Sequence, residues 1–470
     1  MKIFILLPDG IGIRNFVYTD FIDKTLAAGH QVTLWAEQEL LNLTDNITVT
    51  KLALPDLPSS DKHSELLRKA WQTGMLQYES RKFNDNVYLS YISKPDTKRK
   101  RELLKIFMVK WILLTNRSYR RLNLLKSRYI KIICKKSYYK KCLEELESQK
   151  PALLFCTHQR AINAIAPLEA AKKLGIPTAC FIYSWDNLSK ATLFVDSDYY
   201  LVWSEYMKQE LLTYHPEIRS KNIFITGTPQ FAPYFNDNLK IGHSQFADKF
   251  NLPKNRRWIC FSGDDTKTSP HDPVYLKQLA EAVRSWNNKE QNQLHILFRR
   301  CPVDKSDRFD RVLAENQDII TSADPRWRSS DNDSGWHQII PRREDVALLV
   351  NTVLHCDMVI NVGSTMAFDF CIFNKPTLFI NYNAVKDNNW HIDLIYRFIH
   401  FRSMAGTNPV LWVNSESDWL IKIKEAFNNR QVVSECKRWY ETITLHPLDK
   451  ANDRIIASLE EIIRKCTSAS

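Results

Sequence analysis

Short apolar runs alternate with longer amphipathic segments through the first half of the chain. The runs are rich in β-branched and aromatic residues. They occupy residues 1–7, 31–36, 152–158, 178–184, 199–204 and 222–227. Segments between them, such as residues 16–30 and 161–176, carry apolar side chains at helical spacing. Strands that alternate with helices predict a parallel sheet with helices on both faces.

The second half repeats this alternation after a Gly- and Pro-rich stretch at residues 226–235, which is typical of a linker. Its apolar runs occupy residues 257–263, 294–300, 336–341, 357–363, 376–381 and 409–414. A last amphipathic segment, at about residues 450–465, predicts a helix that crosses back to the first domain. We therefore predict an α/β fold of two Rossmann-like, doubly wound domains facing a cleft.

The length of 470 residues suits about two domains, each with its own core. The predicted boundaries are 1–235 for an N-terminal acceptor domain, 236–445 for a C-terminal donor domain and 446–470 for the crossover helix. No run approaches the roughly 20 apolar residues of a membrane span. Several of the ten cysteines lie inside apolar runs and none forms a CxxC pair, which is typical of reduced thiols in the cytoplasm.

Positive charge is concentrated in one segment. The chain carries a net +12, but residues 98–141 hold 16 Lys and Arg against one acid, which makes +15 there and −3 elsewhere. Leu, Ile, Trp and Tyr alternate with these cations. The basic helical insertion at about residues 98–147 is therefore predicted to lie on an anionic membrane surface, or else to be a solvated helical face. No nucleic-acid-binding module accompanies it, so no nucleic acid partner is expected.

Small hydroxyl residues follow one of the apolar runs of the second half. Residues 361–370 read NVGSTMAFDF, so that Gly363, Ser364 and Thr365 stand between a predicted strand and a predicted helix. Backbone N–H groups and hydroxyls at a helix start bind phosphate oxygens without a metal. We predict that this loop holds a phosphate and that Asp369 accepts a hydrogen bond from a ribose hydroxyl. The alternative is a plain turn with Ser364 as the helix cap.

Two further stretches end at the same predicted edge. Residues 261–268 are expected to complete the phosphate cradle with Gly263, Thr266 and Lys267, while their two aspartates are interpreted as turn residues. Arg299 and Arg300 suit forked contacts with a phosphate or a carboxylated sugar, or equally an interdomain ion pair. No metal site is expected.

Three side chains at strand ends of the first half are candidates for the catalytic base or nucleophile. We rank Asp186 first, then His158 and then Asp9. The acceptor is expected to contact Trp185, Asn187 and Arg160, because an aromatic face and an amide suit sugar recognition. Each base candidate has a structural alternative: an Asx turn for Asp186, a hydrogen-bonded core histidine for His158 and a helix cap for Asp9. The first loop lacks the third glycine of a dinucleotide-binding fingerprint, so NAD is not expected and no cofactor is predicted.

The two-domain order, the Gly-Thr-Pro of residues 227–229 and the loop at residues 361–370 resemble GT-B glycosyltransferases. More locally, the loop and the following Lys375-Pro376 resemble CDP-glycerol glycerophosphotransferases and related surface-polysaccharide transferases. These carry a D-x-S-S-x-x-x-D-F-like loop before K-P-x-x-F. Gly363 stands where that family has Ser, and Thr365 stands one residue beyond. The resemblance implies that Ser364 and Thr365 contact the diphosphate of the donor. GT-B enzymes commonly contact the nucleotide base through the backbone after the strand expected at residues 336–341, so the resemblance also implies such a contact near Ile340.

A second local resemblance lies in the first half. FIYSWDNLSK, residues 181–190, is similar to the W-H-G-T-x-x-K stretch of the same family, with Asp186 at the position of the family's His and Lys190 nearby. Together these features predict a metal-independent glycosyltransferase that moves a sugar from a nucleotide donor to a surface glycan or lipid-linked acceptor. We expect it in the cytoplasm, peripherally bound to the inner face of the cell membrane.

Three alternatives stay open: a CDP-alditol phosphotransferase, a sugar-nucleotide epimerase and a membrane-anchored binding protein without catalysis. The donor nucleotide also stays open, as does the choice between inverting and retaining chemistry, because Asp186 suits the role of base and that of nucleophile.

Overall fold

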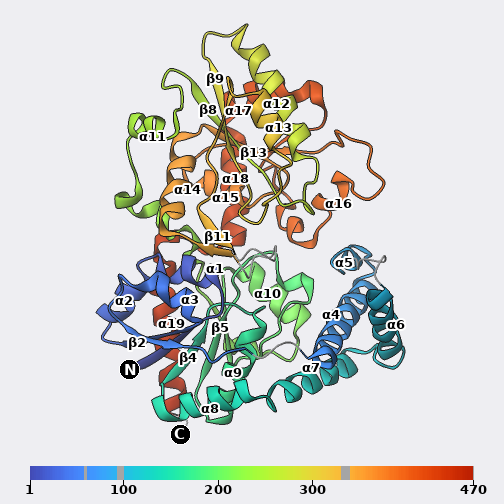
Figure 1. Ribbon diagram of the computed structural model, residues 1–470, viewed down its shortest axis with the longest axis vertical. Coiled ribbons are helices and arrows are strands. Elements are labelled where there is room, and N and C mark those ends of the chain that lie inside the picture. The colour runs from blue at the N-terminus through green and yellow to red at the C-terminus, as the bar shows by residue number, and fades with distance from the viewer. Residues whose placement is uncertain (58–60, 93–99, 330–338, 469–470) are drawn as a thin grey trace. The chain divides into compact units, whose positions relative to one another are not determined.

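The computed structural model describes residues 1–57, 61–92, 100–329 and 339–468. The chain forms two compact units, one of Met1–Thr228 with Lys450–Ser470 and one of Pro229–Asp449. Each unit is built around its own parallel β-sheet, with helices on both sides (Figure 1). The predicted α/β class with two Rossmann-like domains is therefore confirmed.

The sheet of the first unit has seven parallel strands in the order β3-β2-β1-β4-β5-β6-β7. They are β1 (Lys2–Leu7), β2 (Gln31–Ala36), β3 (Thr50–Ala53), β4 (Leu153–Cys156), β5 (Thr178–Phe181), β6 (Tyr199–Val202) and β7 (Ile223–Ile225). β4 and β5 are buried along their whole length, as expected for parallel strands covered on both faces. The strand order reverses between the neighbours β1 and β4, which is the topological switch point of this sheet.

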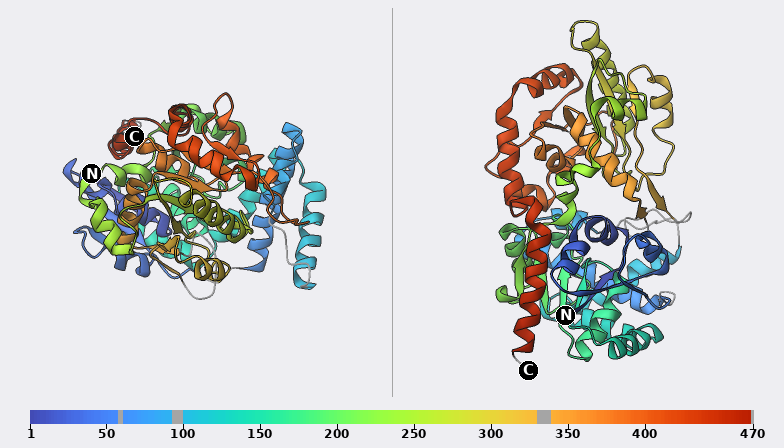
Figure 2. Two further views of the ribbon diagram at one scale, coloured as in Figure 1. Left: turned by 90° about the horizontal axis from the view of Figure 1, so that it is seen from above. Right: turned by 90° about the vertical axis from the view of Figure 1, so that its left-hand side faces the viewer.

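Helices from both ends of the chain cover this sheet. They include α1 (Gly10–Gly12), α2 (Phe21–Ala27), α3 (Gln38–Leu41), α9 (Ile165–Lys173), α10 (Glu205–Tyr214) and α19 (Ala451–Thr467). α19 packs on α2 and β4, and its Ile455, Leu459 and Ile462 are buried. The right-hand view of Figure 2 shows α19 running along the first unit. The last helix therefore completes the core of the first unit.

Another group of helices lies between β3 and β4 in the chain. These are α4 (Lys62–Phe83), α5 (Val87–Ser90), α6 (Lys100–Thr115), α7 (Tyr119–Ile133) and α8 (Ser137–Gln149). α4 packs against both α6 and α7, and α8 packs against α9 (Figure 1). α6, α7 and α8 occupy the basic segment. Across the described ranges, no helix combines the length and the apolar character that crossing a bilayer requires.

The sheet of the second unit has six parallel strands in the order β10-β9-β8-β13-β14-β15. They are β8 (Arg257–Ser262), β9 (Leu294–Arg299), β10 (Ile320–Ser322), β13 (Met358–Asn361), β14 (Thr377–Ile380) and β15 (Leu411–Val413). The helices of this unit include α11 (His243–Phe250), α12 (Asp272–Asn287), α13 (Asp310–Glu315), α14 (Arg343–His355), α15 (Met366–Ile372), α16 (Ile392–Tyr396), α17 (Trp419–Asn428) and α18 (Arg430–Ile443). The switch point here lies between β8 and β13.

The apolar run at residues 336–341 does not join this sheet. Its described part forms β12 (Ile339–Pro341), which pairs antiparallel with β11 (Trp327–Ser329) in a separate two-stranded sheet, and residues 336–338 lie outside the described ranges. The prediction of a further strand in the parallel series is wrong at this point. A proline has no N–H to donate, so Pro341 suits a short or edge ladder rather than the interior of a sheet.

Candidate functional site

Asp9 and His158 lie side by side at the switch point of the first sheet. β1 and β4 are paired in register, with Leu6 opposite Cys156. Asp9 stands two residues beyond the end of β1, and His158 stands two residues beyond the end of β4. Ligands of doubly wound folds bind outside the carboxyl ends of the strands at the switch point. The fold therefore brings two of the three predicted base candidates to the expected place for a ligand.

The Asp9 carboxylate uses its two oxygens for two different tasks. Oδ1 accepts hydrogen bonds from the backbone N–H groups of Ile11 at 3.1 Å and Gly12 at 3.2 Å, and so caps α1. Oδ2 is hydrogen-bonded to Nδ1 of His158. Gly12 lets the loop after β1 pack closely against Thr157, the residue before His158, because a Cβ atom at Gly12 would stand 2.5 Å from Oγ1 of Thr157. The loop sequence thus holds the aspartate rigidly against the histidine.

The electrostatics of the pair favour an ionised aspartate. Burial alone raises the pKa of Asp9, but the charge and hydrogen bond of His158 and the N–H groups of Gly12 and Ile11 bring that pKa below its ordinary value. A carboxylate at Nδ1 orients the imidazole with its Nδ1 proton toward Asp9, so that in the neutral imidazole the lone pair is on Nε2. Among the described residues Nε2 has no hydrogen-bond partner, although His158 is only 5% exposed. This is the arrangement of a histidine prepared to accept a proton.

Several polar side chains lie close to His158. The Tyr183 ring lies edge-on to His158 at 3.9 Å between ring centroids, and Arg160 donates to the Tyr183 hydroxyl at 3.3 Å and to Oδ1 of Asn187 at 2.9 Å. Oε1 of Gln159 accepts the N–H of Tyr183 at 3.1 Å. Arg160 and Asn187 were predicted here, whereas Tyr183 and Gln159 were missed. Both follow strand ends, so the rule that selected His158 would also have selected them.

Asp186 is held by several donors of its own loop. Its carboxylate accepts hydrogen bonds from Oγ of Ser184 at 2.5 Å and Nδ2 of Asn187 at 3.1 Å, and it forms an ion pair with Lys190. About a quarter of each charged side chain of this pair is exposed, at 26% and 25%. Trp185 is buried. Asn187 therefore links Asp186 to Arg160, which lies close to His158. The charge of the Asp186 carboxylate is balanced by Lys190.

A second acid from α10 was not predicted. Burial, followed by the charge of Asp186, raises the pKa of Glu210 to about 8. Its Oε2 is buried without a hydrogen-bond partner in the described part of the chain. Glu210 is therefore a neutral acid at pH 7 beside an ionised one. Its position inside the helical stretch EYMKQELLTY gave no sequence signal, because an isolated Glu in a helix is usually solvated.

The loop after β13 lies at the switch point of the second sheet. Gly363 has a φ of +70°, and the buried side chain of Asn361 accepts the N–H of Ser364 at 2.8 Å. Ser364 in turn accepts the N–H of Met366 through Oγ at 3.4 Å. Gly363, Ser364 and Thr365 are half-buried. The structure thus places the three predicted phosphate-binding residues in one tight turn at the expected edge.

The loop after β8 lies beside it, because β8 and β13 are neighbours. Gly263 is tied to the end of β9 by a hydrogen bond from its N–H to the Arg299 carbonyl at 2.9 Å. Thr266 and Lys267 are exposed, and Oδ1 of Asp265 accepts the N–H of Lys267 at 2.8 Å. Asp265 is thus a turn residue. Thr266 and Lys267 present a hydroxyl and a cation to solvent at this edge.

The other aspartate of this loop is not a simple turn residue. The Asp264 N–H donates to Oδ2 of Asp272 at 2.7 Å, and Oγ of Ser269 donates to Oδ1 of Asp272 at 2.5 Å. Burial raises the pKa of Asp272 to about 7, and burial and the charge of Asp272 raise the pKa of Asp264. Arg308 donates to the carbonyls of Asp264 and Ser269 at 2.6 Å each. These contacts make the base of the loop rigid.

The two predicted arginines have partners within the second unit. Arg299 is buried, and its Nη2 donates to both carboxylate oxygens of Asp345 at 3.0 and 2.9 Å. Burial by itself raises the pKa of Asp345, but Arg299 and the neighbouring donors lower it. Arg300 donates to the Ser306 carbonyl at 2.5 Å and lies 3.5 Å from Asp310. Both guanidinium groups therefore bind protein groups, although the buried Nη1 of Arg299 has no hydrogen-bond partner among the described residues.

Two further predicted contacts are buried. Asp369 accepts a hydrogen bond from the Tyr234 hydroxyl at 2.7 Å and is 3% exposed. Ile340 lies in β12 and is 8% exposed. These two side chains are therefore more buried than the half-buried Ser364 and the exposed Lys267. No group of three or more His, Cys, Asp or Glu side chains with metal-binding geometry occurs within the part of the chain that the structure describes.

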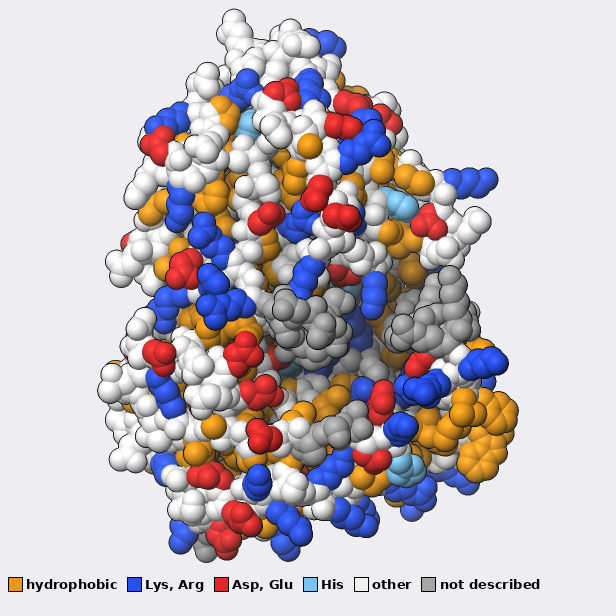
Figure 3. Space-filling model, viewed as in Figure 1, with side chains coloured by type: hydrophobic (Ala, Val, Ile, Leu, Met, Phe, Trp, Pro, Cys, Tyr) orange, Lys and Arg blue, Asp and Glu red, His pale blue; other side chains and the backbone are white. Residues whose placement is uncertain are grey.

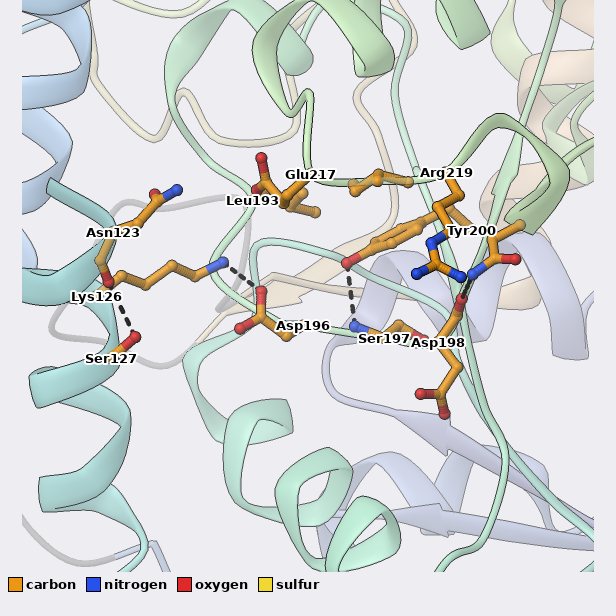
Figure 4. A pocket seen from close by; sticks show the side chains of 12 residues that line it. Asn123, Lys126, Ser127, Leu193, Asp196, Ser197, Asp198, Tyr200, Glu217 and Arg219 are labelled. Atoms are coloured by element: carbon orange, nitrogen blue, oxygen red, sulfur yellow. Dashed lines mark hydrogen bonds and ion pairs between the residues drawn. The ribbon is translucent and has the colours of Figure 1, made fainter. Parts of the chain in front are cut away.

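One cavity, of about 410 Å³, opens at the opposite edge of the first sheet. Its walls include residues that precede β6 and β7, namely Asp196, Asp198, Glu217 and Arg219, and Lys126 of α7 pairs with Asp196 at 2.6 Å across it (Figure 4). None of the predicted site residues lines it. The cavity lies at the amino ends of the strands, away from Asp9 and His158, and we assign it no role in the chemistry.

Comparison with known proteins gives no match in sequence: no family model matches the chain, and no curated protein does. Solved structures match over nearly the whole length. A Staphylococcus aureus MnaA–UDP structure is 11% identical in sequence, with a TM-score of 0.53, and the match covers 98% of this chain and 97% of that one. A UDP-GlcNAc 2-epimerase from Methanocaldococcus jannaschii is 12% identical, with a TM-score of 0.53, and the match covers 98% of this chain and 100% of that one. A glycosyltransferase from Rickettsia africae is 12% identical, with a TM-score of 0.52, and the match covers 100% of this chain and 99% of that one.

These similarities show the fold. The chain has the GT-B type architecture, so the predicted resemblance is confirmed at the level of the fold. At 10–12% identity, the similarity in fold does not identify the reaction that this protein catalyses.

Proposed function

We propose that this protein is a nucleotide-sugar glycosyltransferase in which His158 is the catalytic base and Asp9 orients it. The observation that carries the proposal is the buried Asp9–His158 pair at the switch point of the first sheet, in which Nε2 of His158 has no hydrogen-bond partner among the described residues. The GT-B fold supports a nucleotide-sugar substrate, and one similar structure contains UDP. In the proposal the fold accounts for binding of a nucleotide-sugar donor, and His158 accounts for removal of the acceptor proton.

The proposed step is a direct displacement. Nε2 of His158 takes the proton of the acceptor hydroxyl, and that oxygen attacks the anomeric carbon of the donor sugar. The bond from that carbon to the diphosphate oxygen breaks, and the nucleoside diphosphate leaves with the electron pair. Asp9 stabilises the imidazolium that forms. A direct displacement inverts the anomeric configuration, so the product should have the configuration opposite to the donor.

Base catalysis is assigned to His158 in preference to Asp186, which was ranked first from the sequence. The Asp186 carboxylate is already bound by Ser184, Asn187 and Lys190. An oxygen with several donors holds its proton weakly and is a poor base. In the proposal the half-buried Asp186 and Arg160 bind hydroxyl groups of the acceptor instead, and the buried Asn187 holds these two side chains together beside the histidine.

The donor diphosphate is assigned to the second unit. Ser364 and Thr365 after β13 and Thr266 and Lys267 after β8 supply hydroxyls and one cation at the switch point, and Gly363 and Gly263 shape the two loops. Such groups bind phosphate oxygens and neutralise a leaving diphosphate. The proposed site does not use Arg299, Arg300 or Asp369, which bind Asp345, Ser306 and Tyr234. The backbone contact near Ile340 stays a prediction.

The proposed acceptor is a glycan or a lipid-linked saccharide of a surface polysaccharide, at the inner face of the cell membrane. The basic segment of α6, α7 and α8 supports this, because it suits an anionic surface.

An epimerase acting on a nucleotide sugar is the second candidate. Similar structures include UDP-GlcNAc 2-epimerases, among them the Methanocaldococcus jannaschii protein. Glu210, a neutral acid close to Asp186, gives the first unit an acid in addition to the base at His158. An acid and a base together are what proton abstraction and return at a sugar carbon require.

The deciding experiment has two stages. A thermal-shift screen with UDP, CDP, CMP, GDP, dTDP and their sugars identifies the nucleotide, because a ligand of the folded state raises the melting temperature by mass action. The purified protein is then incubated with the selected donor, with and without a membrane extract as acceptor source, and the products are separated.

Nucleoside diphosphate released only with acceptor supports the transferase, and a changed donor sugar without acceptor supports the epimerase. Release of CMP from a CDP-alditol would identify a phosphotransferase. Binding without turnover under all these conditions would contradict the proposal and indicate a binding protein.

A further inference from the structure

The outer face of α6 exposes large apolar side chains. They are 41–68% exposed and comprise Leu103, Leu104, Phe107, Met108, Trp111 and Leu114. At about 100° per residue these positions fall on one continuous side of the helix. Val109 and Leu113 lie on the opposite side and are buried, because α6 packs there against α4. α6 therefore has two apolar faces, and the fold of the first unit covers one of them.

Basic residues border the exposed face. At the helical spacing Lys110 falls on one side of the apolar strip and Arg101 on the other. The one acid of the helix, Glu102, is turned toward α4, where its carboxylate lies 3.8 Å from Nζ of Lys69. The same carboxylate lies 2.9 Å from Nζ of Lys105, which belongs to α6 itself. Figure 3 shows hydrophobic side chains gathered over α6 with Lys and Arg side chains around them. The exposed strip is thus flanked by cations, and its acid lies on the covered side.

The charge continues along the chain. Fourteen Lys and Arg residues stand at positions 100–141 beside Glu102, whereas the chain outside residues 98–141 is slightly negative. Exposed Arg117, Arg120 and Arg121 follow α6 directly. A surface that is strongly basic around an apolar centre is complementary to an anionic surface with an apolar interior.

We infer that α6 binds the surface of an anionic lipid bilayer, with its apolar strip inserted among the acyl chains and its basic border at the lipid head groups. The helix has 16 residues and is about 24 Å long, so it lies in the interface rather than spanning it. Trp, Phe and Leu beside Lys and Arg are the residues that such interfacial helices use. This inference does not depend on the proposed reaction.

A bilayer fits these features better than a second copy of the chain. A second copy would bring its own +15 segment to the same place, and like charges repel there. An anionic bilayer instead attracts each Lys or Arg side chain that lies near its surface. The charge pattern therefore selects the lipid.

The test is co-sedimentation of the full chain with vesicles of phosphatidylglycerol and phosphatidylcholine, compared with vesicles of phosphatidylcholine alone. The variant Phe107→Ser/Trp111→Ser removes the two most exposed side chains of the strip, at 67% and 68%. Ile421→Ser is the matched control, because Ile421 of α17 is 65% exposed and lies in the second unit. Circular dichroism melts check that both variants stay folded.

We expect the wild type and Ile421→Ser to bind anionic vesicles more tightly than neutral ones, and less tightly in high salt. The double variant should lose at least about tenfold in vesicle partitioning, since each lost aromatic side chain removes apolar surface from the bilayer. Equal binding by the double variant and the control would overturn the inference. So would a wild type that ignores the vesicles and forms a dimer in light scattering that the double variant dissociates.

Discussion

Asp9 and His158 are 149 residues apart in the chain and share one hydrogen bond at the switch point. The imidazole acts as a base only if Nδ1 carries the proton, and the ionised carboxylate ensures this. An amide at position 9 would still cap α1 through its oxygen. Its N–H group, however, would turn toward Nδ1 and favour the opposite tautomer.

Asp9→Asn should therefore lower kcat by about 10²–10⁴, the usual contribution of general-base catalysis, while nucleotide binding stays unchanged. The measurement is kcat from product formation, with the thermal shift by nucleotide as the binding readout. Asp186→Asn is the comparison: it should raise the acceptor KM and keep kcat within about tenfold. The reverse ranking of the two variants would return the base to Asp186.

The backbone conformation of the loop after β13 requires glycine at position 363. Its φ of +70° is unfavourable for a residue with a Cβ, and a Cβ there would stand 2.9 Å from Cζ of Phe401. Gly363→Ala should therefore destabilise the second unit by about 1–3 kcal/mol in urea unfolding and weaken nucleotide binding. Gly406→Ala is the control, since it has a φ of +81° and no atom within 4 Å of the added Cβ. A smaller loss at Gly363 than at Gly406 would contradict the steric part of this argument.

At the scale of the elements, α4 carries a buried acid that should make stability depend on pH. Burial raises the pKa of Glu79 to about 8, and its Oε2 has no hydrogen-bond partner within the described ranges. The unfolded chain loses this proton near the ordinary value of 4.5, so between pH 4.5 and 8 the folded state binds more protons. The free energy of unfolding must then fall as pH rises through this window.

Glu79→Gln cannot ionise, so it should gain stability over the wild type as pH rises from 5 to 8, on the order of 2–5 kcal/mol. Urea midpoints at several pH values measure this difference. Glu65→Gln is the matched control, because it makes the same substitution on the same helix at a side chain that is 39% exposed. A constant difference between Glu79→Gln and wild type across the pH range would show that Glu79 ionises normally.

The same scale shows why some strands are readable from sequence and others are not. β1, β4 and β13 are buried apolar runs, which the sequence displays directly. β3 (TKLA) is a half-exposed edge strand and β10 (ITS) has three residues, so neither carries a clear periodic signal. Edge strands are held by one neighbour and need few apolar residues, which explains why both were missed.

At the scale of the whole molecule, the two units differ in how their chain segments are assembled. The second unit is one continuous stretch, Pro229–Asp449, whereas the first needs α19 from the other end of the chain. α19 buries Ile455, Leu459 and Ile462 in the first unit. The fragment 229–449 should therefore fold alone and unfold cooperatively, and the fragment 1–228 should not.

Circular dichroism melts of both fragments measure this difference. Adding residues 450–470 to the fragment 1–228 through a flexible linker should restore folding. In the full chain, Leu459→Ala should cost about 2–5 kcal/mol, the usual loss for a buried leucine. A cooperative melt of the fragment 1–228 without α19 would contradict this role of the last helix.

The sequence by itself determined what depends on neighbouring residues. Apolar runs and helical spacing determined the buried strands of both sheets and the two-domain α/β fold, and the motif at Gly363-Ser364-Thr365 marked a strand end. Strand ends also selected Asp9 and His158 as candidates, because polar groups at these ends meet at one edge of a parallel sheet. These signals are local, so one sequence suffices to read them.

The tertiary structure decided what depends on residues distant in the chain. It joined Asp9 to His158, gave Asp186 an ion pair with Lys190 and occupied Arg299 with Asp345. It also packed one face of α6 on α4 and left the other exposed, which the alternating cations and apolar residues did not reveal. Partner choice and exposure arise from packing between elements, and no periodicity along the chain encodes them. The site therefore became visible only when the strands were placed side by side.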